Sequence, residues 1–170
     1  DKKLIAVNQY QRFVFIQMVD KKTEKFQQAE AMRKAGDTLT GMLNKMKIEN
    51  VVLSDEKMDD ELLAYAEGMA LGNYQFLKYK TDAPKEQNKL VAIKIHCAAL
   101  KAKPKKIEQL NILLDAVCKA RDLVNEPVMF LTATKLAESF QDMGLEAGFK
   151  VEVFNKNKIE SMKMGGLLAV

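Results

Sequence analysis

The sequence has very few of the residues from which catalytic and metal sites are usually built. His96 is the single histidine among 170 residues, and Cys97 and Cys118 are the two cysteines. Neither an HxxxH nor a CxxC spacing occurs, so His96 is interpreted as a packed or surface residue rather than a metal ligand. Two cysteines without such a spacing predict buried, reduced thiols in a reducing compartment, not a disulfide.

Phosphate-binding and nucleophile motifs are also missing. The sequence contains no GxGxxG, GxxxxGK[ST] or GxSxG pattern, and the pair Gly165-Gly166 predicts only a tight turn. No apolar run approaches the about 20 residues that cross a bilayer, and the first residues lack the apolar segment of a signal peptide. We therefore expect a cytoplasmic protein with no membrane partner.

What is present is the composition of a globular protein, with 48% hydrophobic and 29% charged residues. The length allows one domain, or one domain plus part of another. The net charge is +4, and the basic residues are dispersed. The densest basic cluster, Lys101, Lys103, Lys105 and Lys106 around Pro104, lacks interleaved aromatic residues, so a solvated loop is predicted and nucleic acid is not expected as a partner.

One cluster of acidic residues could in principle hold a hard cation. It consists of Asp55, Glu56, Asp59, Asp60 and Glu61. Its spacing differs from the alternating oxygen ligands and central glycine of a calcium loop. Acidic residues favour the first turn of a helix, so helix capping is the preferred interpretation.

Strand-like and helix-like segments alternate along the chain. Strands are predicted at residues 12–19, 50–54 and 90–97, and amphipathic helices at 26–46, 58–73 and 105–124. The first strand is apolar on both faces, which is typical of a central strand. Gly36 and Gly41 are interpreted as positions of close helix packing, and residues 78–89 as a loop or hairpin. The alternation predicts an α/β fold with a largely parallel sheet.

After a domain boundary predicted near Asn125, the alternation resumes. Thr132 or Thr134 can cap a helix that Gly148 ends. A strand at 149–154, a short helix at 158–162 and a strand at 167–170 are predicted next. The last strand is of the buried type and needs neighbours on both sides. We expect those neighbours beyond residue 170.

Four patches in order resemble the cytosolic leucyl aminopeptidase family, the M17-type dinuclear metallopeptidases. Residues 120–127 (ARDLVNEP) are similar to the junction between the family's two domains, and residues 148–153 (GFKVEV) to a strand of its catalytic domain. Residues 159–170 match its I-x-x-x-x-M-G-x-L-L-A-V segment, with Lys163 where a glycine is common. Residues 66–80 are similar to its A-E-G-x-x-L-G-x-Y-x-F-x-x-Y-K helix.

The resemblance implies a fold and an activity. It implies a macro-domain-like N-terminal α/β domain over residues 1–124, with residues 105–124 as a linking helix, and the beginning of a catalytic α/β domain, truncated, over 125–170. The family places more structure before its strand at Arg12 than eleven residues supply, which leaves the completeness of the first sheet open. The whole protein is then expected to be a cytoplasmic homohexamer that removes N-terminal amino acids from peptides, with two zinc, manganese or magnesium ions.

No catalytic, cofactor-binding or metal-binding residue is predicted within the chain itself. The family's ligand motifs, a lysine-and-aspartate stretch and an N-[ST]-D-A-E-G-R stretch, have no counterpart here. Arg121, Asp122, Asn125 and Pro127 match the family pattern, and structural work at the end of the linking helix is expected of them. The segment alone is predicted to be inactive. The alternative hypothesis is a non-catalytic binding or regulatory module that contacts nucleotide, nucleic acid or neighbouring subunits.

Overall fold

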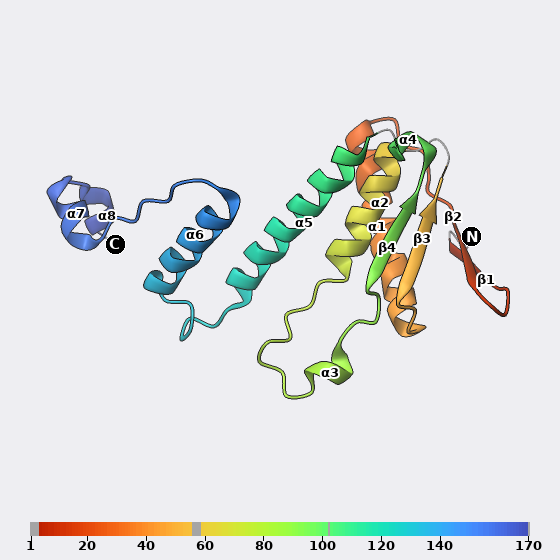
Figure 1. Cartoon of the computed structure of the whole chain (residues 1–170), viewed down its shortest axis with the longest axis horizontal. Helices are drawn as coiled ribbons and strands as arrows, with labels where there is room; N and C mark the ends of the chain where they lie inside the picture. Colours follow the sequence, from red (N-terminus) through yellow and green to blue (C-terminus); the bar gives the residue numbers. More distant parts are fainter. Residues whose placement is uncertain (1–3, 56–58, 102, 170) are drawn as a thin grey trace. The chain divides into compact units, whose positions relative to one another are not determined.

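A computed structural model describes residues 4–55, 59–101 and 103–169 (Figure 1). By its internal contacts the chain divides into two compact units, residues 1–121 and residues 122–170. Both helices and strands occur in the first unit, so the α/β class predicted from the sequence is confirmed. Among the described residues, none of the helices combines the length and apolar character needed to cross a membrane.

The first unit contains two separate pairs of strands. β1 (Leu4–Asn8) and β2 (Phe13–Gln17) form an antiparallel hairpin in which Leu4 faces Gln17 and Asn8 faces Phe13. β3 (Asn50–Ser54) and β4 (Ala92–His96) run parallel, in register from Asn50 with Ala92 to Ser54 with His96. Parallel strands need a long crossover connection, and the segment between these two contains a helix that packs behind them (Figure 1).

Two long helices pack against each other and form most of the core. They are α1 (Lys25–Lys45) and α2 (Asp59–Gly72), which lie side by side in Figure 1. Apolar residues at three- and four-residue steps give each helix one buried face. The fully buried side chains Leu43 and Met69 meet there, and Leu53 of β3 joins the same core.

Three further helices complete the first unit. α3 (Ala83–Glu86) is a single turn within residues 78–89, and α4 (Ala98–Lys101) follows β4 directly. α5 (Pro104–Asn125) begins at a proline, which is favoured in a first helical turn. Its bounds agree with the linking helix predicted over residues 105–124.

The second unit is helical in the residues that the structure describes. α6 (Ala133–Ala147) is capped by Thr132, whose side chain accepts a hydrogen bond from the Lys135 amide, and it ends at Gly148 with φ of 76°. Both features match the predicted cap and stop. α7 (Lys156–Ser161) and α8 (Gly165–Leu168) follow. The predicted short helix at 158–162 is thereby confirmed, to within two residues at its start.

Several predicted strands are wrong. The segment 12–19 is not a central strand of a parallel sheet: β2 pairs only with β1 among the described residues, and Ile16 on it is 51% exposed. Residues 149–154 are not a strand, and the predicted strand at 167–170 begins as the helical turn α8, with residue 170 outside the described part. An apolar run becomes a strand only where a neighbour pairs with it, and residues 149–154 and 167–169 have no such neighbour among the described residues.

Two smaller predictions also need correction. β1 was not foreseen, because its apolar residues lie at the start of the chain without a recognisable turn pattern. Gly36 is a close-packing position, since an added Cβ would lie 2.2 Å from the Tyr65 carbonyl oxygen. Gly41 is not a close-packing position, because a Cβ added there would have nothing within 4 Å.

Candidate functional site

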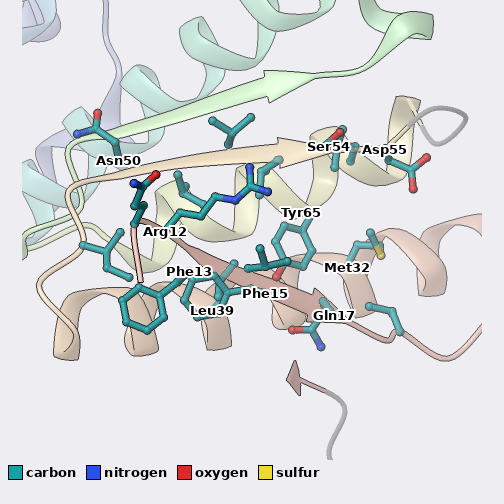
Figure 2. A pocket seen from close by; sticks show the side chains of 18 of the residues that line it. Arg12, Phe13, Phe15, Gln17, Met32, Leu39, Asn50, Ser54, Asp55 and Tyr65 are labelled. Carbon is teal, nitrogen blue, oxygen red and sulfur yellow. The ribbon is translucent and has the colours of Figure 1, made fainter. Parts of the chain in front are cut away.

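A large hollow of the first unit lies between β2 and β3. It has a volume of about 1090 Å³ and is floored by Met32 and Leu39 of α1 and by Leu62 and Tyr65 of α2. Figure 2 shows the side chains of β2 and β3 on its two sides, with Arg12 and Asn50 near one end and Asp55 at the other. The cavity is therefore mainly apolar below and carries polar groups at its ends.

Tyr65 is the polar group at the floor of this cavity. Its side chain is 5% exposed, and its hydroxyl has no hydrogen-bond partner among the described residues. Burial raises the pKa of the Tyr65 hydroxyl to about 12, because the phenolate would be poorly solvated there. Tyr65 is thus a neutral hydrogen-bond donor at physiological pH.

The acidic cluster lies at the start of α2, as the capping interpretation predicts. Asp60 forms an ion pair with Lys106 of α5, and Asp55 faces the cavity. Glu56 lies outside the described residues, and nothing is described of the Asp59 side chain. Within the described part of the chain, no three histidine, cysteine or acidic side chains are close enough to hold a metal ion.

The histidine and the cysteines do not form a reactive pair. His96 is exposed at the end of β4, Cys97 is buried with 2% exposure, and Cys118 is half-buried on α5. Both thiols are free, as predicted. Cys97 belongs to the apolar core, which is the usual role of an unreactive buried cysteine.

The glycine-rich part of the 66–80 motif serves close packing of α2 against α1. A Cβ added at Gly68 would lie 2.1 Å from the Arg33 carbonyl oxygen, so the two backbones touch at this point. The same contact is reinforced by an Arg33–Glu67 ion pair at 2.9 Å. Thr40, which is 1% exposed, places its hydroxyl 3.2 Å from the Met69 carbonyl oxygen. These residues fix the helix pair on which the cavity rests.

An asparagine network extends the motif toward β4. The Asn44 side-chain oxygen accepts hydrogen bonds from the backbone amides of Lys89 and Leu90, at 2.8 and 3.0 Å. The Asn44 amide group donates to Asn73 at 2.9 Å, and Asn73 donates to the Leu90 carbonyl oxygen at 2.9 Å. Three segments that are distant in sequence are joined at one point, which positions the start of β4.

Arg121 of the 120–127 motif anchors α5 to the end of α2. Its Nη1 donates to the Leu71 carbonyl oxygen at 2.8 Å, and its guanidinium lies 5.3 Å from the Tyr74 ring centroid. Leu71 is in the last turn of α2, where carbonyl groups lack helical partners and a cation is favourable. Arg121 is expected from the sequence to act at the end of its own helix, whereas its described contact is with the end of α2.

The end of α5 leads into a turn at Pro127. The Pro127 carbonyl oxygen accepts hydrogen bonds from the amides of Phe130 and Leu131, at 2.8 and 3.0 Å. Thr132 then caps α6, so the motif connects two helices through a turn.

In the basic cluster, Lys103 and Lys105 are exposed, whereas Lys106 forms an ion pair with Asp60.

Comparisons with known proteins match both parts of the chain to one family. Residues 7–83 match the model of the cytosol aminopeptidase family N-terminal domain, and residues 118–170 match the model of the same family's catalytic domain. A probable cytosol aminopeptidase of Clostridium perfringens is 34% identical over 149 residues, which cover 83% of this chain and 30% of the relative. A probable cytosol aminopeptidase of Chlorobaculum tepidum is 34% identical over 173 residues, which cover 84% of this chain and 32% of the relative.

Solved structures show the same fold at lower identity. A mutant of tomato leucine aminopeptidase superposes with a TM-score of 0.72 at 14% identity, over 94% of this chain and 33% of that one. The bottromycin maturation enzyme BotP, solved in complex with Mn, superposes with a TM-score of 0.67 at 19% identity. The match covers 85% of this chain and 30% of that one. The chain thus spans about a third of the length of the proteins that it resembles.

Proposed function

Because the chain belongs to the cytosol aminopeptidase family, whose N-terminal and catalytic domain models both match it in order, we propose that it is part of a metal-dependent aminopeptidase. The whole protein hydrolyses the first peptide bond of peptides and releases their N-terminal amino acids. The observation that carries the proposal is the order of the two matches, at 7–83 and 118–170; α5 begins between them and overlaps the second.

In this proposal the chain supplies a scaffold rather than reacting groups. Residues 1–124 form the N-terminal domain with its linking helix, and residues 125–170 contribute to the catalytic domain. Arg121 supports this division, because it ties the linking helix to the last turn of α2. The linking helix therefore holds a fixed place on the N-terminal domain, and it carries the chain from there toward the catalytic domain.

The residues after Pro127 carry many exposed apolar side chains, including Val128, Met129 and Phe130 at 82%, 83% and 56% exposure. On α6 and beyond it, Leu145 and Phe149 are 84% and 59% exposed. Side chains of this size are normally covered in a folded protein. We propose that the rest of the catalytic domain covers them, and that the whole protein assembles as a homohexamer.

Two divalent ions, zinc, manganese or magnesium, are the cofactors that the proposal assigns to the whole protein. The described residues do not fit such a site: Asp60 is paired with Lys106, and His96 stands alone at the end of β4. Ligands from residues outside this chain are therefore proposed, and no catalytic residue is assigned within it.

A chimera tests the proposal. Residues 1–170 replace the matching third of the Clostridium perfringens relative, and hydrolysis of leucine p-nitroanilide is measured with added Mn²⁺. A metal-dependent activity and a hexameric mass by light scattering are expected. The matched control is the same chimera with Gly68→Leu, which separates α1 from α2 and should lose both. A chimera that assembles as a hexamer but hydrolyses nothing would contradict the proposal.

A further inference from the structure

The linking helix α5 is much less buried than the other long helices of the first unit. None of its residues from Pro104 to Asn125 is buried, and every one of them lies within the described ranges. By contrast, α1 buries five residues, including Leu39 and Leu43. α5 meets the core through Leu110, which is partly buried. Apolar burial supplies most of the free energy that holds a helix in place, so α5 is docked more weakly than α1.

Two polar contacts tie α5 to α2, one toward each end of α5. Near its start, the Lys106 ammonium forms an ion pair with Asp60, whose side chain is 76% exposed. Near its end, Arg121 donates to the Leu71 carbonyl oxygen at 2.8 Å. The two contacts are about 22 Å apart along the helix axis, at 1.5 Å of rise per residue. In both contacts α5 supplies the cation.

Between these contacts, α5 lies over a hollow. The hollow has a volume of about 350 Å³ and lies between α2, β4 and α5. Its α2 wall includes Ala66 and Ala70, whose single methyl groups leave the space unfilled. Val91, which also lines it, is 80% exposed, so the hollow is open to solvent. Because side chains across an unfilled space lose their dispersion contacts, the middle of α5 gains little attraction from α2.

We propose that α5 is a strap that detaches from α2 as one helix while α1 and α2 stay packed against each other. The described structure is the docked state, and the Lys106 and Arg121 contacts set the fraction of molecules that are docked. The ion pair with Asp60 is exposed, so salt screens it and favours the detached state. α5 begins between the two segments matched by the domain models and reaches into the second, so its detachment makes the link between them adjustable.

The two free thiols of the chain report detachment without any added group. Cys118 is half-buried on α5, and Cys97 is buried in the core with 2% exposure. Labelling by the uncharged reagent 4,4′-dithiodipyridine is followed at each cysteine by mass spectrometry. We expect Cys118 to react through detachment of α5, at a rate that about 1 M urea leaves nearly unchanged, because detachment exposes little surface. Cys97 should react only through unfolding of the core, at a rate that rises steeply with urea.

Removing either contact should speed the labelling of Cys118. Lys106→Ala should raise its rate by about threefold, as for an exposed ion pair, and Arg121→Ala by about tenfold, as for a hydrogen bond from a charged group. Raising NaCl from about 0.05 M to about 0.5 M should speed labelling of the natural chain by about twofold, and that of Lys106→Ala less, because its ion pair is already absent. Lys105→Ala, at an exposed neighbouring position, is the matched control and should leave the rate unchanged.

Filling the hollow should have the opposite effect. Ala70→Leu adds apolar contact between α2 and α5, and we expect it to slow the labelling of Cys118 by about threefold or more. The rate at Cys97 in the same sample shows whether the core of this variant is intact. If Ala70→Leu fails to fold, the salt dependence of the natural chain and its reduction in Lys106→Ala carry the test.

The outcomes decide for or against the strap. Faster labelling of Cys118 in Lys106→Ala and Arg121→Ala, with Cys97 unchanged, supports it. A Cys118 rate that neither substitution alters would overturn it, because the thiol would then react in the docked state. Rates at Cys118 and Cys97 that rise together with urea would also overturn it, because α5 would then be released only by unfolding of the core. These readouts need no peptidase activity, so they are independent of the proposed function.

Discussion

The guanidinium of Arg121 donates to the carbonyl oxygen of Leu71 at 2.8 Å and so joins the linking helix to the last turn of α2. These residues are fifty positions apart in sequence. Each belongs to a motif shared with the cytosol aminopeptidases, one at residues 66–80 and the other at 120–127. The contact therefore joins the two motifs in the folded chain.

Loss of this contact should destabilise the first unit. Arg121→Ala removes a charge-assisted hydrogen bond and the stacking on Tyr74, and we expect a loss of about 2 kcal/mol in the free energy of unfolding. Urea unfolding followed by circular dichroism measures it. Lys105→Ala, at an exposed position of the same helix, serves as the control and should change the value by less than about 0.5 kcal/mol. Equal effects of both substitutions would show that the Arg121–Leu71 contact contributes nothing to the free energy of unfolding.

Two glycine substitutions should have opposite effects. Gly68→Ala places a methyl group against the Arg33 backbone and should cost about 2 kcal/mol or more, because neither backbone can yield without separating the helices. Gly41→Ala meets open space in a helix interior and should stabilise by about 0.5–1 kcal/mol. Thermal unfolding of both variants distinguishes the two signs. A stabilising Gly68→Ala would contradict the α1–α2 contact.

The asparagine network should be sensitive to its central member. Asn44→Ala leaves the amides of Lys89 and Leu90 without their acceptor, and we expect a loss of about 2–3 kcal/mol. Exchange of those two amides should accelerate together, which NMR can follow. Asn111→Ala, an exposed asparagine on α5, is the matched control and should leave both amides unchanged. Unaltered exchange in Asn44→Ala would mean that other groups hold the start of β4.

The raised pKa of the buried Tyr65 hydroxyl predicts that the folded chain loses stability at alkaline pH. Its pKa is raised to about 12 in the folded chain, from an ordinary value of 10.0, so the folded state keeps a proton that the unfolded state releases. The stabilisation is complete below pH 10 and is lost as the pH rises through 12. The full difference between the two pKa values corresponds to about 3 kcal/mol.

Tyr65→Phe isolates this contribution from the lysines that titrate in the same range. The variant should lack the tyrosine-dependent part of the decline between pH 10 and 12. At pH 7 it should be at least as stable as the natural chain, since it removes a buried hydroxyl without a partner. Urea midpoints across pH 8–12 for both chains provide the comparison. If the urea midpoints of the two chains changed with pH in parallel, the Tyr65 hydroxyl would be shown to be solvated.

Local patterns in the sequence predicted the helices well, and also the strands at 50–54 and 90–97, but not the place of residues 12–19 or the structure of 149–154 and 167–169. The cap at Thr132, the stop at Gly148 and the proline at the start of α5 act within one turn of chain, so their consequences can be read from neighbouring residues. Whether residues 12–19 form a central or an outer strand depends on which segment lies beside them. That information is not contained in the segment itself.

The same distinction holds for the candidate site. The role of Gly36 could be anticipated only as close packing of some kind, and the partner, the Tyr65 carbonyl oxygen, needed the structure. The cavity had no sequence signal, because it is formed by four elements that are separated along the chain. Tyr65 was likewise not singled out. A tyrosine in an otherwise apolar stripe at helical spacing was the available hint.

The most direct test of the central claim uses the 170-residue chain alone. Hydrolysis of leucine p-nitroanilide is measured with added Mn²⁺ or Zn²⁺, beside the full-length Clostridium perfringens relative as the positive control. We predict no metal-dependent turnover above the blank, because the described residues form no metal site and the ligands are proposed to lie outside this chain. Metal-dependent turnover by the purified chain would contradict the assignment of its residues to a scaffold.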